Sequence, residues 1–145
     1  MKVPFVDLQA QYQNLKSALL SKIEQVFSEG SFIMGSHVKD FEEAVSEYLG
    51  QPSLGCASGS DALLLALMAM GIKAGDEVIT TPFTFFATVG AIARLGATQV
   101  FVDIDSETFN VDPAKIPAAI TPKTKAIIVV HLFGQCADMD KIVAI

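Results

Sequence analysis

The sequence predicts an α/β fold in which a mainly parallel sheet carries helices on both faces. From residue 53 onward, short apolar runs typical of strands alternate with longer runs in which apolar residues recur every three or four positions. The run 125–130 is almost continuously apolar, as expected for a strand that is buried on both faces. Strands of this kind, joined by helices, form parallel sheets with right-handed crossovers.

The composition excludes several classes of protein. The chain has 145 residues, of which 51% are hydrophobic, so it can form a core as one domain or as part of one. It carries 16 acidic and 10 basic residues, and no cluster of Lys or Arg could follow a nucleic-acid backbone. Its most apolar segment, 62–72, is too short to cross a bilayer, and Asp7 and Gln9 interrupt any secretory signal. We therefore expect a cytoplasmic protein that binds neither nucleic acid nor membranes.

The two cysteines, Cys56 and Cys136, have neither the spacing nor the neighbouring histidines of a metal site. We expect buried thiols in a reducing compartment, and no metal ion.

Residues 1–50 predict a helical segment. Apolar spacing predicts a first helix that ends at Gly30 and a second over 38–49 that ends at Gly50. The side chains expected to face inward on the second helix are Val38, Phe41, Val45 and Tyr48. The connecting loop, 31–35, is unusually apolar, so it either packs on the core or lines a site or a subunit contact.

Residues 51–145 predict alternating strands and helices. The expected strands are 54–57, 77–80, 99–102 and 125–130. The expected helices are 61–70, ended by Gly71, and 84–95, ended by Gly96, followed by a short helix after Asp112-Pro113 and another that starts at Asp138.

The loop Ser58-Gly59-Ser60 opens directly into the apolar helix 61–70 and is a candidate anion site. The free N–H groups of a helix start and the helix dipole attract a phosphate, and glycine allows the ligand to come close. The alternative is an ordinary N-cap on a core helix.

In parallel sheets, ligands bind beyond the carboxyl ends of the strands. Here those ends are followed by 58–60, 80–86, Asp103 with Asp105, and 131–135. Neither G-x-G-x-x-G nor G-K-[ST] occurs, which argues against dinucleotide and P-loop chemistry.

Short segments along the whole chain carry a family resemblance. They are Pro4-Phe5-Val6-Asp7-Leu8, Gly30-Ser31-Phe32-Ile33-Met34-Gly35, Ala57-Ser58-Gly59-Ser60-Asp61-Ala62-Leu63, Gly75-Asp76-Glu77-Val78-Ile79, Pro82-Phe83-Thr84-Phe85-Phe86-Ala87-Thr88, Phe101-Val102-Asp103-Ile104-Asp105 and His131-Leu132-Phe133-Gly134-Gln135-Cys136-Ala137-Asp138-Met139. Together they resemble the DegT/StrS family of sugar aminotransferases.

The resemblance implies a pyridoxal-phosphate (PLP) enzyme of fold type I, with an aspartate-aminotransferase-like large domain. Members act on nucleotide-linked keto sugars with an amino-acid donor such as glutamate, usually as homodimers. The run Gly134-Gln135-Cys136-Ala137-Asp138 looks most like the branch that aminates UDP-linked 3-keto hexuronic acids for surface polysaccharide.

The resemblance also implies roles for particular residues. Ser58, Gly59 and Ser60 would hold the cofactor phosphate, with Ser60 in place of the family's usual Thr. Phe85 would stack on the pyridine ring, and its alternative is a core aromatic. His131 and Gln135 would lie near the cofactor, although a histidine that closes a buried strand is often a core residue. Substrate or subunit contacts are implied for Phe32, Met34 and Gly35.

Asp103 and Asp105 are candidates for paired acid–base carboxylates, but the pattern favours turn residues after a strand.

The chain departs from the family in one important respect. Transamination needs a Schiff-base lysine and an aspartate that keeps the pyridine nitrogen protonated, and in the family both come after the position of Ile145. None of the lysines present suits this role. We therefore expect an incomplete large domain, residues 51–145, without the C-terminal small domain and inactive by itself. In addition, Pro52 and Gly55 weaken the strand 54–57, which could shift the phosphate loop.

Three other interpretations stay open. One is a sugar dehydratase of the same family, in which the lysine is replaced. Another is a non-catalytic fragment or interaction module that pairs through an unfinished sheet edge. The third is an α/β module that binds flavin mononucleotide or a sugar phosphate at 58–60.

Overall fold

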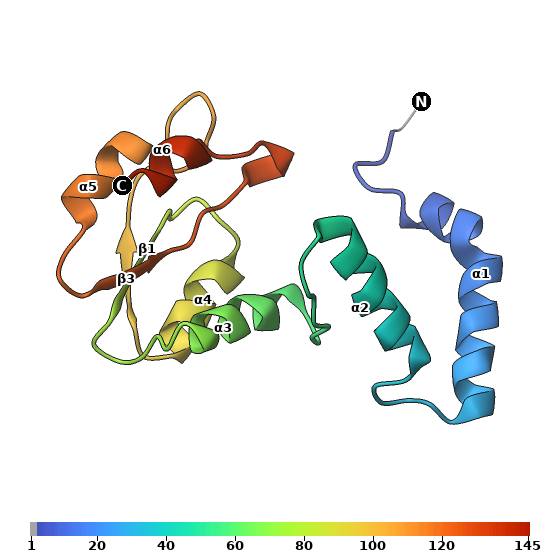
Figure 1. Ribbon diagram of the computed structural model, residues 1–145. Coiled ribbons are helices and arrows are strands. Elements are labelled where there is room, and N and C mark those ends of the chain that lie inside the picture. The colour runs from blue at the N-terminus through green and yellow to red at the C-terminus, as the bar shows by residue number, and fades with distance from the viewer. Residues whose placement is uncertain (1–2) are drawn as a thin grey trace. The chain divides into compact units, whose positions relative to one another are not determined.

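The computed structural model describes residues 3–145, which fall into two compact units that are divided between Gly55 and Cys56 (Figure 1). Each unit is described by itself.

The first unit is a pair of helices, α1 (Leu8–Glu29) and α2 (Ser36–Leu49). The Asp7 side chain caps α1, because its Oδ1 accepts the Ala10 N–H at 2.9 Å. Both helices end at glycines in the left-handed region, Gly30 at φ 65° and Gly50 at φ 66°. These two stops are confirmed, and α2 begins two residues before the predicted start.

Helices α1 and α2 bury no residue completely. Val38 and Val45 are half-buried. Phe41 lines the open space between α1 and α2, as predicted, but stays 62% exposed, whereas Tyr48 is 89% exposed, so the prediction that Tyr48 faces inward is wrong. The spacing located the apolar stripe of α2 correctly. A stripe becomes buried only where another element covers it, and two helices cannot enclose a core.

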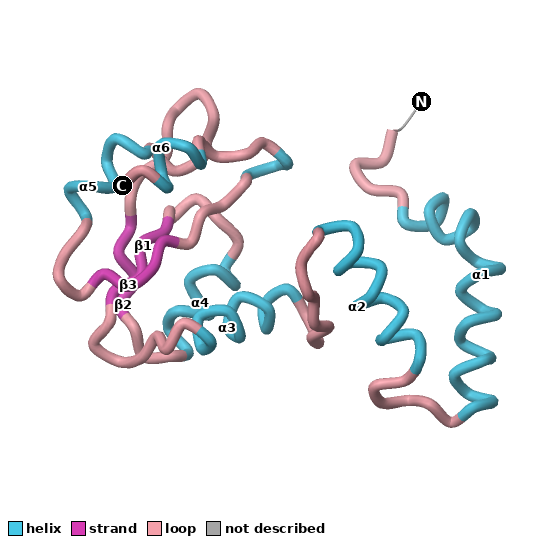
Figure 2. Tube along the Cα trace, in the orientation of Figure 1, coloured by secondary structure: helices cyan, strands magenta, loops and turns pink. Residues whose placement is uncertain are grey.

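The second unit is built on a small sheet (Figure 2). The sheet has three parallel strands in the order β2-β1-β3. Its strands are β1 (Glu77–Thr80), β2 (Thr98–Phe101) and β3 (Thr124–Ile127). In the register, Ile79 lies between Val100 and Ile127. Strand β1 matches its predicted bounds, β2 lies one residue earlier than predicted, and β3 ends before the predicted residue 130.

Helices cover both faces of this sheet, which confirms the predicted fold class (Figure 1). The first face packs Val78 against α3 (Gly59–Ala69) and α4 (Phe86–Arg94). The second face packs Ile79 against α5 (Ile116–Ala119) and α6 (Met139–Val143). Neighbouring strand residues point to opposite faces, so this single pair anchors both cores. Two short 3₁₀ helices complete the unit, η1 (Pro113–Lys115) and η2 (Leu132–Gly134).

The predicted strand 54–57 does not form. Strand β1 already has a neighbour on each side, and the backbone before Cys56 is held by side chains of α2 instead. The Gly55 N–H donates to Glu42 Oε1 at 2.7 Å, and the Ser53 N–H donates to Ser46 Oγ at 2.9 Å. An apolar run that has no strand to pair with stays irregular.

The prediction of buried thiols is also wrong, because Cys56 and Cys136 are both exposed and unbridged. Both lie in loops next to helix starts, where the chain runs over the surface.

Among the described helices, none combines the length and the apolar character needed to cross a membrane.

Ile79 has no exposed surface and packs in the core of the second face, so Ile79→Ala should lower the free energy of unfolding by about 3 kcal/mol. Ile33, the same residue type at 87% exposure, is the matched control, and Ile33→Ala should cost less than about 0.5 kcal/mol. Urea denaturation measures both values. Equal losses in the two variants would show that β1 is not the centre of the core.

Candidate functional site

The carboxyl edge of the sheet brings together the starts of α3 and α4. Helix α4 follows the carboxyl end of β1. Helix α3 ends shortly before β1 begins, so its last turn lies toward the amino edge and its first turn toward the carboxyl edge. The two helices pack on each other, and at the amino edge Gly96 lies against Ala74. Ligands of parallel sheets bind at the carboxyl edge.

The first turn of α3 has the features of an anion site. The Ala62 N–H donates to the Ser58 carbonyl at 2.9 Å and the Asp61 N–H to Ser58 Oγ at 3.2 Å. The N–H groups of Gly59 and Ser60 precede these bonds and have no acceptor within the helix. A Cβ placed on Gly59 would meet no atom within 4 Å, so a ligand can approach the backbone closely.

The Ser58 hydroxyl is committed to the cap. Besides accepting the Asp61 N–H, it donates to Asp61 Oδ2 at 3.0 Å. The other oxygen of Asp61, Oδ1, lies 3.5 Å from Nη1 of Arg94, which offsets part of its negative charge. Ser58 therefore shapes the loop, and the exposed Ser60 hydroxyl is the one free to meet a ligand.

Phe85 lies at the start of α4, in the N-cap position, with extended backbone angles. Its side chain is 76% exposed, so Phe85 is not a core aromatic. An exposed ring at the carboxyl edge offers an apolar face to a flat ligand.

His131 and Gln135 flank the 3₁₀ turn η2, which follows the third strand. The Ala137 N–H donates to His131 Nδ1 at 3.0 Å, so in the neutral ring the proton lies on Nε2. Both residues are exposed, so His131 is not a buried core histidine.

Asp103 and Asp105 act as turn residues, which confirms the favoured interpretation. Asp105 Oδ1 accepts the N–H groups of Glu107 and Thr108 at 3.0 and 2.9 Å, and Asp103 Oδ1 accepts the Ile104 N–H at 2.8 Å. The bond from Thr108, then that from Glu107, holds the pKa of Asp105 below its usual value of 3.8. A carboxylate with a lowered pKa is a poor general base.

Asn110 is buried, with only 2% of its surface exposed, and the sequence pattern did not predict a role for it. Its Oδ1 accepts the Leu132 N–H at 2.9 Å, and its Nδ2 donates to the Gln135 carbonyl at 3.1 Å. The only local signal was a polar residue at the end of an Asp-rich turn, which is typical of any loop.

Phe32, Met34 and Gly35 lie in the first unit, in the loop between α1 and α2. The Phe32 ring meets Phe27 edge-on at 5.3 Å. Met34 is 73% exposed at φ 51°. A Cβ on Gly35 would lie 2.8 Å from the Ser31 carbonyl oxygen, so only glycine fits here.

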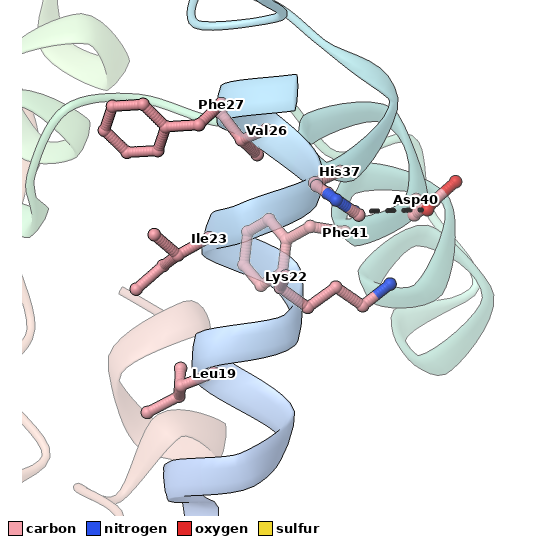
Figure 3. Close-up of a pocket in the computed structure, with 8 residues that line it drawn as sticks. All are labelled: Leu19, Lys22, Ile23, Val26, Phe27, His37, Asp40 and Phe41. Carbon is pink, nitrogen blue, oxygen red and sulfur yellow. Dashed lines mark ion pairs between the residues drawn. The ribbon is translucent and has the colours of Figure 1, made fainter. Parts of the chain in front are cut away.

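The first unit also carries an open hollow of about 540 Å³ between α1 and α2 (Figure 3). Its walls are mainly apolar, and the pair His37 Nδ1–Asp40 Oδ2, 3.9 Å apart, lies at its side. The lining residues are Leu19, Lys22, Ile23, Val26, Phe27, His37, Asp40 and Phe41. Walls of this kind suit packing better than acid–base chemistry.

Comparisons with known proteins agree with the geometry of the second unit. The model of the DegT/DnrJ/EryC1/StrS aminotransferase family matches residues 13–145. The chain is 53% identical to the pleiotropic regulatory protein of Geobacillus stearothermophilus, over 100% of this chain and 39% of that protein. It is 46% identical to the UDP-2-acetamido-2-deoxy-3-oxo-D-glucuronate aminotransferase of Pseudomonas aeruginosa, over 99% of this chain and 40% of that one. The chain thus spans about 40% of the length of these relatives.

A solved structure, NtdA from Bacillus subtilis with bound cofactor PMP, superposes with a TM-score of 0.93 at 38% identity. The superposition covers 97% of this chain and 33% of NtdA.

Ser58→Ala removes the cap of α3 and should lower the free energy of unfolding by about 1 kcal/mol. Ser58→Asn is the matched control, because Asn caps as well as Ser and should stay within about 0.3 kcal/mol of the wild type. Urea denaturation distinguishes the two variants. A Ser58→Ala variant as stable as the wild type would contradict the capping role.

The lowered pKa of Asp105 makes stability depend on pH. The folded pKa lies below the unfolded one, so the contribution is present above about pH 4 and is lost as the pH falls through the folded pKa. Asp105→Asn keeps an acceptor for the turn but has no charge to titrate. The free energy of unfolding, measured between about pH 5 and pH 2, should fall less steeply with decreasing pH for this variant than for the wild type. Coinciding profiles would contradict the assignment.

Proposed function

Because the chain belongs to the DegT/DnrJ/EryC1/StrS aminotransferase family, we propose that it forms the cofactor-phosphate side of a PLP-dependent enzyme that aminates a nucleotide-linked keto sugar. The observation that carries the proposal is the open first turn of α3, an anion site on the carboxyl edge of a parallel sheet.

The residues present fit PLP. The free N–H groups of Gly59 and Ser60 suit a phosphate, and the space beside Gly59 admits it. The exposed ring of Phe85 suits a flat pyridine ring. We assign Gly59, Ser60 and Phe85 to direct contact, Ser58 to shaping the loop, and His131 and Gln135 to positions near the ring. When bound, PLP supplies an electron sink for the electrons of a broken bond at carbon.

The chain's own side chains then have distinct tasks. The Ser60 hydroxyl and two backbone N–H groups hold the phosphate and so fix the position of the cofactor. The ring of Phe85 covers one face of the pyridine and excludes water from it. His131 presents the N–H of Nε2, because its Nδ1 is occupied by the Ala137 N–H, and so acts as a hydrogen-bond donor.

We further propose a UDP-linked 3-keto hexuronic acid as substrate, glutamate as amino donor, and a role in surface polysaccharide biosynthesis. The name of the Pseudomonas aeruginosa relative, a UDP-3-oxo-glucuronate aminotransferase, supports this choice of sugar.

We also propose a cytoplasmic homodimer in which Phe32, Met34 and Gly35 contact the substrate or the second subunit. Phe32 is 63% and Met34 73% exposed, and the exposure of these apolar side chains supports the proposal that a substrate or a second subunit covers the loop.

The test measures PLP binding by the intact protein. Binding is monitored through the change in the absorbance of PLP. Ser60→Ala removes one hydrogen bond to the phosphate and should weaken binding about fivefold, and Phe85→Ala should weaken it about tenfold. Ser28→Ala, at the end of α1, is the matched control and should bind as the wild type does. Amino transfer from glutamate to the UDP-keto sugar, detected by the mass of the product, is expected only when the polypeptide also supplies the Schiff-base lysine.

A wild-type protein that does not bind PLP would refute the proposal. Equal affinities of Ser60→Ala, Phe85→Ala and Ser28→Ala would refute the assigned residues while leaving the cofactor in place.

A further inference from the structure

The three loops at the carboxyl edge of the sheet are tied together by two adjacent residues, Phe109 and Asn110. Both lie in the loop 102–112 that follows β2. Phe109 faces the loop after β1, where its ring lies 6.0 Å from that of Phe83. Asn110 reaches the segment after β3 through its two side-chain hydrogen bonds. The residues proposed to meet the cofactor ring, Phe85 and His131, lie on the two loops that are joined in this way.

The Asn110 carboxamide is matched to its two partners. It meets one backbone N–H, of Leu132, and one backbone carbonyl, of Gln135, so it must accept on one atom and donate on the other. A carboxylate can only accept, and an aliphatic side chain can do neither. At 2% exposure, water cannot replace the lost partner, so both backbone groups depend on this side chain.

The loop that carries Asn110 is itself firmly held. The Asp105 N–H donates to the Asn110 carbonyl at 2.9 Å, and the Phe109 N–H donates to the Asp105 carbonyl at 2.9 Å. Phe109 adopts φ 59°, a left-handed conformation that a bulky residue rarely adopts. Such a conformation persists when surrounding contacts hold it in place, and it is found most often at functional sites.

We propose that Asn110 is a positioning residue, which holds the segment 131–135 against the loop after β2 and thereby sets where His131 meets the cofactor ring. The inference deepens the proposed function and rests on it. Asn110 itself does not contact the cofactor. It acts through the backbone of Leu132, the first residue of the turn η2, and of Gln135, the residue just after it.

The test compares Asn110→Ala with Val111→Ala in the intact protein. Val111 is the adjacent residue and is equally buried at 2%, but it packs against Ile79 in the core and leaves both bonds of Asn110 in place. Each variant is measured for PLP dissociation constant, for the visible circular dichroism of bound PLP, and for amide hydrogen exchange at Leu132.

Asn110→Ala should raise the PLP dissociation constant about tenfold and change the dichroism band, while Val111→Ala should stay within about twofold of the wild type. Exchange at Leu132 should be at least about tenfold faster in Asn110→Ala than in Val111→Ala, in denaturant conditions that equalise their global stability. Asn110→Asp keeps the acceptor for Leu132, so it should restore slow exchange there without restoring the affinity.

Three outcomes decide the matter. Equal exchange at Leu132 in Asn110→Ala and Val111→Ala would overturn the proposal. Faster exchange at Leu132 with unchanged PLP affinity and dichroism would also overturn it, because the segment would then be held without positioning anything for the cofactor. A wild-type protein that does not bind PLP is recognised separately and refutes the proposed function, while exchange at Leu132 still decides whether Asn110 holds the segment.

Discussion

Backbone hydrogen bonding on both edges of β1 is the constraint on which the 56–145 unit depends. Since β1 pairs with β2 on one side and β3 on the other, its polar backbone is satisfied and its side chains can be fully buried. Val78 and Ile79 have no exposed surface and lie in the cores of opposite faces. Because both ladders are parallel, all three strands end at the same edge, and the loops that follow them meet there.

The chemistry at that edge arises from groups that the helices leave unpaired. Helix α3 uses the Ser58 hydroxyl and carbonyl to satisfy Asp61 and Ala62, which leaves the preceding N–H groups for a ligand. Arg94 offsets part of the negative charge of Asp61, so the positive end of the helix dipole is less opposed by its own first turn. Phe85 starts α4 with its ring in solvent, where a regular core residue would be covered.

The two units achieve order in different ways. The loops at the carboxyl edge contain little regular structure, and side-chain bonds from Asp105, Asn110 and His131 to the backbone hold them in shape. In the first unit, α1 is capped by Asp7 and both helices end at glycines, but the apolar stripes of α1 and α2 line an open hollow. Capping and turn formation are local and need no partner, whereas burial needs a second surface.

The sequence by itself determined what local chemistry decides. Helix ends at Gly30, Gly50 and Gly71, each in the left-handed region, follow from the conformational freedom of glycine, and β1 follows from a run of suitable residues between turns. The motif order likewise identified the family and pointed to Ser58-Gly59-Ser60 and Phe85.

Only the tertiary structure decided the contacts between distant residues. It left 54–57 without a strand partner and Tyr48 in solvent, and it joined Asn110 to backbone groups 22 and 25 residues further along the chain. Strand pairing and burial depend on which surfaces meet, and the type of a residue does not specify which distant residue it will contact.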